Sequence, residues 1–277
     1  MSDAIGAMTA AFGDDIEVPV RQLLGPSMFM PGRVGATTGM KVVSVVPGKP
    51  FGIVAVFDED GACLGLVDGS TLTAIRTAAG AGLATQILAR PDSRTMTMFG
   101  SGAMAFDQVM AVKEVRPVDE VLVWSRNPNH AAALAEQIGG SAVTDPDAAA
   151  EAADVITTAT PAREPLFDSA AVRPGTHINA VGAFTPEMVE IPPSLVQTAV
   201  VFVDDLRAAA EEAGDLLAAS VEPWGTIADL LAGRVEGRTE HDQVTLFKSV
   251  GIASQDVAAG VAALRTAMEQ DLGAEIG

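Results

Sequence analysis

The stretch "TMTMFGSGAMAFDQ", Thr95–Gln108, constrains the fold more than any other part of the chain. A short β-type run leads into Gly100-x-Gly102-x-x-Ala105, and a helical pattern begins at these glycines. In a dinucleotide-binding fold, such glycines allow a tight turn and a close approach to a pyrophosphate, and the helix N-terminus supplies oriented N–H donors. The motif alone is weak evidence, because other doubly wound proteins also contain a glycine turn.

The order of the predicted elements supplies the context that the glycine motif needs. From residue 91 onward, strand patterns such as "TMTMF", "EVLVWS", "DVITTAT" and "AVVFVDD" are separated by helical patterns or short connections. This alternation predicts right-handed βαβ units and a parallel sheet. The nearly continuous apolar strands predict a sheet covered on both faces. We therefore expect an α/β protein with a Rossmann-type doubly wound parallel sheet.

The residues on either side of this region follow other patterns. "KVVSVV" and "GIVAVF" indicate strands, Asp60-Gly61 indicates a hairpin, and "STLTAIRTAAGAGLATQILAR" indicates a helix that Pro91 ends. The last pattern, "IASQDVAAGVAALRTAMEQDLG", indicates another long helix. The simplest organisation is a dinucleotide-binding domain at 91–244, inserted into a smaller α+β lobe made of 1–90 plus 245–277.

Composition narrows the classes of partner. The net charge of −19 repels phosphate backbones, so we expect no nucleic-acid partner. The chain contains no apolar run long enough to span a membrane, and its acidic start does not resemble a signal peptide. The single Cys63 suits a reducing cytoplasm, where we expect the protein. His130, His177 and His241 show no ligand spacing, which predicts no metal site; we expect a solvated His130 and a structural His177.

The end of the second strand of the predicted domain bears on the choice of dinucleotide. NAD sites usually have an acidic residue there, which binds the ribose 2′-hydroxyl. This chain reads "VLVWSRNPNH", with Ser125 and Arg126 in that place. A hydroxyl and a guanidinium suit a 2′-phosphate through charge-assisted hydrogen bonds. NADP(H) is therefore the preferred cofactor, with NAD(H) as the alternative, because a loop arginine can also be merely solvated.

Several longer stretches carry a family likeness. They include "LVDGSTLTAIRTAAGAGLATQILARPD", "FGSGAMA", "VLVWSRN", "RPGTHINAVGAFTPEMVEI" and "VTLFKSVGIASQD". In these stretches the chain resembles the ornithine cyclodeaminase/μ-crystallin family, almost end to end from about Val18 to Gly273. The resemblance implies an inserted Rossmann domain, flanking segments that form a substrate-binding and dimerisation lobe, and a homodimer acting on a small amino or imino acid.

The resemblance also implies roles for particular residues. Arg21 and Arg76 are similar to the pair that holds the substrate α-carboxylate, and Lys41 is similar to the family's active-site lysine. Two fixed guanidiniums would orient an imino or amino acid, and a lysine of lowered pKa could exchange a proton with it. The residues that we expect to contact the cofactor are Gly100, Ser101, Gly102, Ala103, Met104, Ser125, Arg126, Asn127, Thr160, Val181 and Ser249.

Three departures from the family pattern bear on the reaction. Phe184 stands where the cyclodeaminases carry an aspartate that is implicated in their acid–base steps, and a phenylalanine cannot accept a proton. Met104 replaces a glutamine that many members carry after the second glycine. The chain also looks shorter than usual at its start and near 47–51, so the resemblance leaves the barrel and the dimer contacts of the substrate lobe less well defined.

These observations predict an NADPH-dependent reductase of a 2-imino acid or cyclic ketimine carboxylate. Pyrroline- and piperideine-2-carboxylate are examples of such substrates, and Phe184 would form an apolar substrate-binding wall. One alternative is an amino-acid cyclodeaminase or dehydrogenase of the ornithine, lysine or alanine type that uses NAD(H). The other is a non-catalytic, μ-crystallin-like protein that holds NADPH and a carboxylate ligand without turnover.

Overall fold

The structure is a computed structural model, and it describes residues 1–46 and 51–274. The chain divides into two compact units. One unit comprises residues 77–251 with Met1, and the other comprises 2–76 with 252–277. The division falls within helix α2 (Gly69–Leu88).

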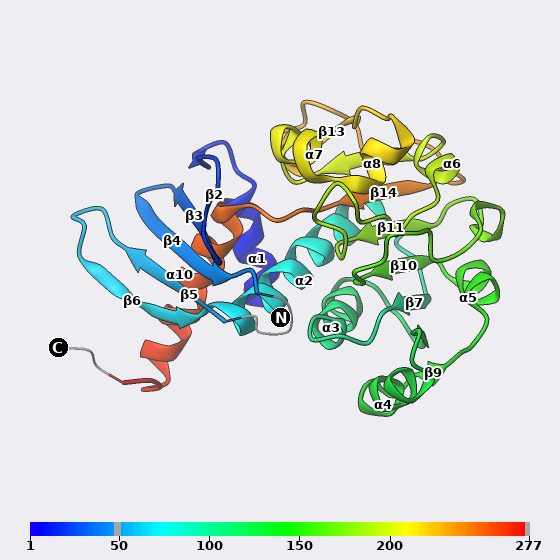
Figure 1. Ribbon diagram of the computed structural model, residues 1–277, viewed down its shortest axis with the longest axis horizontal. Helices are drawn as coiled ribbons and strands as arrows, with labels where there is room; N and C mark the ends of the chain where they lie inside the picture. The colour runs from blue at the N-terminus through cyan, green and yellow to red at the C-terminus, as the bar shows by residue number, and fades with distance from the viewer. Residues whose placement is uncertain (47–50, 275–277) are drawn as a thin grey trace. The chain divides into compact units, whose positions relative to one another are not determined.

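The larger unit contains an eight-stranded sheet in which all paired strands are parallel (Figure 1). The strand order is β13-β12-β14-β11-β10-β7-β8-β9. The strands are β7 (Thr95–Phe99), β8 (Glu120–Trp124), β9 (Ser141–Ala142), β10 (Val155–Thr158), β11 (His177–Ala180), β12 (Val200–Val203), β13 (Gly225–Thr226) and β14 (Thr245–Lys248). Because β8 and β9 lie on one side of β7 and β10 lies on the other, the chain reverses its direction of winding at β7, as in a Rossmann fold.

Apolar side chains cover both faces of this sheet. In β10, Val155 belongs to a core cluster with residues of α3 and α4, whereas its neighbour Ile156 belongs to a second cluster with residues of α5, α6 and α8. Successive side chains of a strand point to opposite faces, so the two clusters lie on opposite sides of the sheet. The helices are α3 (Ala105–Val115), α4 (Pro128–Ile138), α5 (Pro146–Ala152), α6 (Pro193–Val196), α7 (Leu206–Glu212), α8 (Gly214–Ala219) and α9 (Ile227–Leu231), with a 3₁₀ turn at Ser169–Ala171.

The helix ends follow from local sequence. The side chain of Asp145 caps α5 by accepting from the backbone N–H groups of Asp147 and Ala148, and Pro146 occupies the first turn. Both residue types are favoured at these positions of a helix start. Gly139 ends α4 in the left-handed conformation that glycine tolerates, with a φ of 68°.

The smaller unit contains an antiparallel six-stranded sheet with order β1-β3-β4-β5-β6, and β2 also pairs with β3. Its elements are α1 (Ser2–Ala11), β1 (Ile16–Glu17), β2 (Gln22–Leu24), β3 (Ser27–Val34), β4 (Thr37–Ser44), β5 (Gly52–Phe57), β6 (Cys63–Asp68) and α10 (Ala253–Glu269). Helix α10 packs against β3–β6 and against α1 (Figure 1). Gly39 allows this approach, because a Cβ there would lie 2.9 Å from Val257 Cγ2.

Alternation along the strands decides which side chains face α10. In β4, Lys41 is buried and its neighbour Met40 is exposed; in β5, Val54 is buried and Ile53 is exposed. A period of two is expected when one face of a sheet packs on a helix and the other does not. The same alternation places a cationic side chain, Lys41, inside the unit.

The predicted fold class is confirmed: a doubly wound parallel sheet lies in one unit and a smaller α+β unit flanks it in sequence. The boundaries of the compact units differ from those predicted, because β14 pairs with β11 and β12 and residues 245–251 therefore belong with the parallel sheet. Residues 77–90 also belong there. Helix α1 and strands β1–β3 were not predicted, because no long periodic pattern marks them.

No helix among residues 1–46 and 51–274 is long and apolar enough to cross a membrane. Within the same ranges, no cluster of three or more His, Cys, Asp or Glu side chains is arranged to hold a metal ion. Of the segment noted for its shortness, 47–51, residues 47–50 lie outside the described residues.

Candidate functional site

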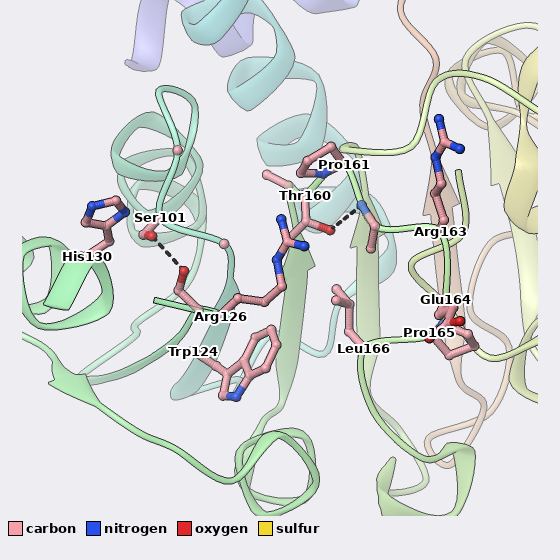
Figure 2. Close-up of a pocket in the computed structure, with 15 residues that line it drawn as sticks. Ser101, Trp124, Arg126, His130, Thr160, Pro161, Arg163, Glu164, Pro165 and Leu166 are labelled. Atoms are coloured by element: carbon pink, nitrogen blue, oxygen red, sulfur yellow. Dashed lines mark hydrogen bonds between the residues drawn. The ribbon is translucent and has the colours of Figure 1, made fainter. Parts of the chain in front are cut away.

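A pocket of about 700 Å³ lies at the carboxyl ends of β7, β8 and β10. This is the position where the winding of the sheet reverses, and it is the usual ligand site of an open α/β sheet. Three chain segments form its walls, one after each strand (Figure 2). The lining residues are Gly100, Ser101, Gly102, Trp124, Ser125, Arg126, His130, Ala159, Thr160, Pro161, Ala162, Arg163, Glu164, Pro165 and Leu166.

The two glycines of the fingerprint have different structural roles. Gly100 has a φ of +115°, and a Cβ there would lie 2.7 Å from the carbonyl oxygen of Ala159, so this position needs glycine for backbone packing. Gly102 has no atom within 4 Å of its ideal Cβ position, which leaves open space in the pocket wall. Helix α3 then begins after Met104 without a side-chain cap. An uncapped helix N-terminus beside an open glycine fits the diphosphate of a dinucleotide.

The segment after β8 presents neutral and cationic groups to the pocket. The hydroxyl of Ser101 donates to that of Ser125 at 2.9 Å, which joins the glycine loop to the end of β8 (Figure 2). Arg126 is exposed and lines the same wall. The lining residues of this segment, Trp124, Ser125, Arg126 and His130, include no carboxylate.

Most residues of the third wall, the segment after β10, were not predicted from the sequence. Of the segment 159–166, only Thr160 was predicted, because no motif marks the residues that follow β10. Trp124 and His130 were also missed as pocket residues. His130 is exposed, as expected, but it lines the pocket from the first turn of α4.

Five predicted cofactor residues do not line this pocket: Ala103, Met104, Asn127, Val181 and Ser249. Two of them are buried. The backbone N–H of Val181 donates to Thr158 O at 3.0 Å, and the hydroxyl of Ser249 donates to Asp204 Oδ2 at 2.8 Å. The side chain of Asn127 caps α4 by accepting from Asn129 N. Their proposed contacts with a cofactor stay predictions.

The smaller unit holds a buried cluster of charged groups. Lys41 Nζ lies 3.0 Å from Asp256 Oδ1 and 2.8 Å from Oδ2. Arg76 Nε lies 3.0 Å from the same Oδ1, and its Nη1 donates to Gln255 Oε1 at 2.9 Å. All four side chains are buried, with Lys41 3% and Asp256 1% exposed. The structure thus brings together two predicted residues, Lys41 and Arg76, on a carboxylate that was not predicted.

The electrostatic balance of the cluster sets the proton affinity of Lys41. Burial lowers the pKa of Lys41 to about 8; the Asp256 carboxylate opposes this shift, whereas the positive charges of Arg76 and Arg21 add to it. For Asp256, burial raises the pKa, but the charges of Lys41 and Arg76 outweigh burial and lower it overall. Lys41 can therefore hold and release a proton near neutral pH, while Asp256 stays ionised.

A buried cation such as Arg76 needs a partner, because leaving it unpaired is costly. The sequence could not say which of the 36 acidic residues would supply it. Asp256 lies in the first turn of α10, in the "SQD" stretch, where a negative charge also favours the helix dipole. Three polar residues at the start of an otherwise alanine-rich helix were the only available signal.

Phe184 belongs to the larger unit, in the loop that follows β11. Its side chain is 49% exposed, whereas phenylalanine side chains are most often buried. Arg21 belongs to the smaller unit and is half-buried. The roles of both residues in substrate binding stay predictions.

Comparisons with known proteins agree with this architecture. The sequence profile described as "Ornithine cyclodeaminase/mu-crystallin family" matches residues 13–270. The chain is 36% identical over 260 residues to a Δ1-pyrroline-2-carboxylate reductase of Bacillus cereus, with 86% of this chain and 80% of the relative covered.

Two solved structures have closely similar folds. Δ1-pyrroline-2-carboxylate reductase of Thermococcus litoralis, in complex with NADH and L-proline, has a TM-score of 0.92 and 29% identity, covering 99% of this chain and 94% of the other. An archaeal alanine dehydrogenase dimer with bound NAD has a TM-score of 0.90 and 28% identity, covering 100% and 94%. The relatives are nicotinamide-dependent oxidoreductases, in agreement with the expected class. With a family profile matched over most of its length, this chain belongs to the ornithine cyclodeaminase/mu-crystallin family.

Proposed function

We propose that this protein is an NADPH-dependent reductase of a 2-imino acid or cyclic ketimine carboxylate, of the pyrroline- or piperideine-2-carboxylate type. The observation that carries the proposal is the buried cluster in which Lys41, with a pKa of about 8, and Arg76 share the Asp256 carboxylate. A fixed cation beside a titratable ammonium suits a substrate that carries a carboxylate and needs a proton. The names of the similar reductases support the same substrate class.

In this proposal, Arg76 holds the substrate carboxylate. Its guanidinium is oriented by Asp256 through Nε and by Gln255 through Nη1. The side chain therefore loses little conformational entropy when it binds a carboxylate. Arg21 would add a second positive charge, since its charge already acts on Lys41. A guanidinium remains charged at every working pH, which separates binding from proton transfer.

Lys41 would hold the proton that the imine nitrogen receives. Its ammonium form dominates below pH 8, and its lowered pKa makes it a better acid than an exposed lysine. Asp256 positions the ammonium with both oxygens and stabilises its charge. When bound, NADPH supplies the hydride for the imine carbon.

The preference for NADPH rests on the segment after β8. Ser125 and Arg126 line the pocket where an NAD site would carry a carboxylate, and a guanidinium can bind a 2′-phosphate. The similar structures are complexes with NADH and NAD, so the finer choice depends on this chain's own residues. Ser101, Gly102 and the N-terminus of α3 would hold the diphosphate.

Phe184 favours reduction over cyclodeamination. A benzyl side chain has no group that takes or gives a proton, whereas ring closure with loss of ammonia needs additional acid–base steps. Its exposed ring would instead offer an apolar wall to a cyclic imine.

The test is a panel of 2-imino acids and cyclic ketimine carboxylates, offered to the purified protein with NADPH and, separately, with NADH. We expect oxidation of NADPH with at least one cyclic ketimine carboxylate and a higher kcat/KM than with NADH. Release of ammonia from ornithine or lysine without net cofactor oxidation would indicate a cyclodeaminase. Net reduction of cofactor by an amino acid would indicate a dehydrogenase, and tight NADPH binding without any turnover would indicate a binding protein.

We also propose that the protein forms a homodimer through the sheet face opposite α10. Apolar side chains from three adjacent strands lie on this face: Met40, Val42, Ile53, Ala55 and Leu66. Met40, Ile53 and Leu66 are each more than a third exposed, and a continuous apolar patch of this kind marks an interaction surface. One similar structure is a dimer. Light scattering should give a dimer for the wild type and a monomer for Ile53→Arg; a monomeric wild type at micromolar concentration would refute the proposal.

A further inference from the structure

The carboxylate of Glu190 joins two loops of the larger unit. Its Oε1 accepts from the backbone N–H of Thr160 at 2.7 Å and from the Thr160 hydroxyl at 2.8 Å. Its Oε2 accepts from the backbone N–H groups of Gly182 and Ala183 at 2.8 and 2.9 Å. Thr160 belongs to the pocket wall, and Ala183 directly precedes Phe184. One fully buried side chain therefore contacts both segments.

Further hydrogen bonds fix the pocket loop to Glu190 and its neighbour. Val189 N donates to Ala162 O at 2.9 Å, and Leu166 N donates to Glu190 O at 3.0 Å. Within the loop, Ala162 N donates to the hydroxyl oxygen of Thr160 at 3.3 Å (Figure 2), so this hydroxyl gives its own hydrogen to Glu190. The position of the 160–166 wall thus depends on the place of Glu190.

The other side of Glu190 is held by a buried ion pair. Asp215 Oδ1 accepts from Glu190 N at 2.6 Å and from Ile191 N at 2.9 Å. Lys248 Nζ lies 2.7 Å from Asp215 Oδ2 and also donates to Ala183 O. All three charged side chains are 0% exposed. Burial raises the pKa of Glu190, and the charge of Lys248 opposes the shift.

No neutral side chain can replace the Glu190 carboxylate as a hydrogen-bond acceptor for both loops. Its Oε1 accepts two hydrogen bonds from the loop with Thr160, and its Oε2 accepts two from the loop with Gly182 and Ala183. A glutamine has a single acceptor oxygen, and its amide nitrogen would face N–H donors on the other side. The loops also touch directly, because a Cβ on Gly182 would lie 2.1 Å from Thr160 N. A shift of one loop must therefore displace the other.

We propose that Glu190 is a positioning residue that couples the cofactor-pocket wall at 160–166 to the segment that carries Phe184. The identity of the two ligands rests on the proposed function, but the coupling itself follows from the hydrogen bonds of one carboxylate. Displacement of Glu190 should weaken the binding of cofactor and of imine substrate together. It should leave the chemical step at saturation almost unchanged, because Glu190 is fully buried and does not line the pocket.

The test compares Glu190→Gln with Thr158→Val. Thr158 is a matched control, because it is buried at the end of β10 and its hydroxyl has no hydrogen-bond partner among the described residues. For Glu190→Gln we expect the Kd of NADPH, measured by fluorescence without turnover, to rise about ten-fold, the loss expected for a charged hydrogen bond. The KM of the imine should rise several-fold, with kcat within about two-fold of the wild type.

Hydrogen exchange gives a second readout that needs no substrate. In Glu190→Gln, amides of both 160–166 and 182–184 should exchange faster, while Thr158→Val should leave both segments as in the wild type. A change in one segment alone, or an unchanged NADPH Kd, would overturn the coupling. If Glu190→Gln does not fold, Glu190→Asp, which keeps two acceptors on a shorter stem, must show the same paired loss. If no imine is reduced by the wild type, the proposed function fails, while the NADPH Kd and exchange still decide the coupling.

Discussion

Lys41 and Asp256 face each other inside the smaller unit, with the ammonium nitrogen 3.0 and 2.8 Å from the two carboxylate oxygens. They are 215 residues apart in sequence. Strand β4 presents Lys41 on its buried face, and the first turn of α10 presents Asp256 to it. Because both groups are almost fully buried, their pairing bears on the charge state of Lys41.

Removal of the Lys41 ammonium should abolish most turnover. For Lys41→Met, which keeps the length of the stem, we expect kcat to fall by about 10²- to 10⁴-fold, the usual contribution of a general acid. The NADPH Kd should stay within two-fold, since Lys41 does not line the cofactor pocket. Lys113→Met is the control, because Lys113 belongs to α3 of the larger unit, where it donates to the carbonyl of Ile138. Retention of full kcat in Lys41→Met would exclude Lys41 as the proton donor.

The pH dependence should report the pKa of Lys41. The ammonium form is present below about pH 8 and is lost above it, so kcat/KM should fall as the pH rises through about 8. Asp256 raises this pKa, and Asp256→Asn should therefore move the descending limb to lower pH, by roughly one unit or more. A limb that stays in place, or that moves to higher pH, would contradict the assignment.

Arg126 should determine the discrimination between the two nicotinamide cofactors. For Arg126→Ala, we expect kcat/KM with NADPH to fall about 10- to 100-fold, the loss of charged hydrogen bonds to a phosphate, while kcat/KM with NADH changes little. Arg163→Ala removes another arginine of the same pocket, from the segment after β10, and should leave the NADPH-to-NADH ratio within about two-fold. Equal losses with both cofactors in Arg126→Ala would argue against a 2′-phosphate contact.

The two glycines of the pocket should respond differently to alanine. Gly100→Ala should lower the free energy of unfolding by about 1–3 kcal/mol, because its φ is +115° and the new Cβ would meet Ala159 O. Gly102→Ala should leave stability within about 0.5 kcal/mol, because its Cβ meets no atom, but should raise the NADPH Kd. Urea unfolding and NADPH fluorescence measure the two effects. A stable Gly100→Ala, or a Gly102→Ala that binds NADPH normally, would contradict these roles.

His177 should make the larger unit sensitive to acid. Burial lowers its pKa to about 3, and the nearby charge of Arg238 adds to the shift. The unfolded chain then binds more protons than the folded one between about pH 6.5 and 3, so stability is lost as the pH falls through this window. The slope from this residue is about 1.4 kcal/mol per pH unit. His177→Asn should remove that part of the slope between pH 6 and 4; identical slopes would refute the prediction.

Local patterns were sufficient to predict a parallel sheet in the larger unit. The glycine motif, the alternation of strands and helices after Pro91, and the caps at Asp145 and Gly139 depend on residues close in sequence, and the structure contains the expected parallel sheet. Local patterns did not indicate to which unit β14 belongs. Its partners β11 and β12 are distant in sequence, so local patterns did not indicate that residues 245–251 pack with the parallel sheet.

The candidate sites also contain residues that local sequence predicts and residues that it does not. Ser101, Ser125, Arg126 and Thr160 follow strand ends, and the carboxyl ends of parallel strands meet at one edge, so their common pocket could be predicted. The partner of Lys41 could not, because nothing in β4 indicates which acidic residue will lie opposite. The same holds for Glu190, which reads as an ordinary acid between valine and isoleucine.

The sequence by itself determined the fold class, the glycine motif after β7 and the absence of an acidic residue after β8, because each depends on residue type at short spacing. Only the tertiary structure decided the burial of Lys41, its pairing with Asp256 and Arg76, and the contact of Glu190 with two loops. Burial and long-range pairing set the free energy of a charge, and both depend on which elements pack together. The fingerprint residues locate a dinucleotide pocket. Burial gives Lys41 the lowered pKa on which the proposed reduction depends, with Asp256 opposing the shift and Arg76 adding to it.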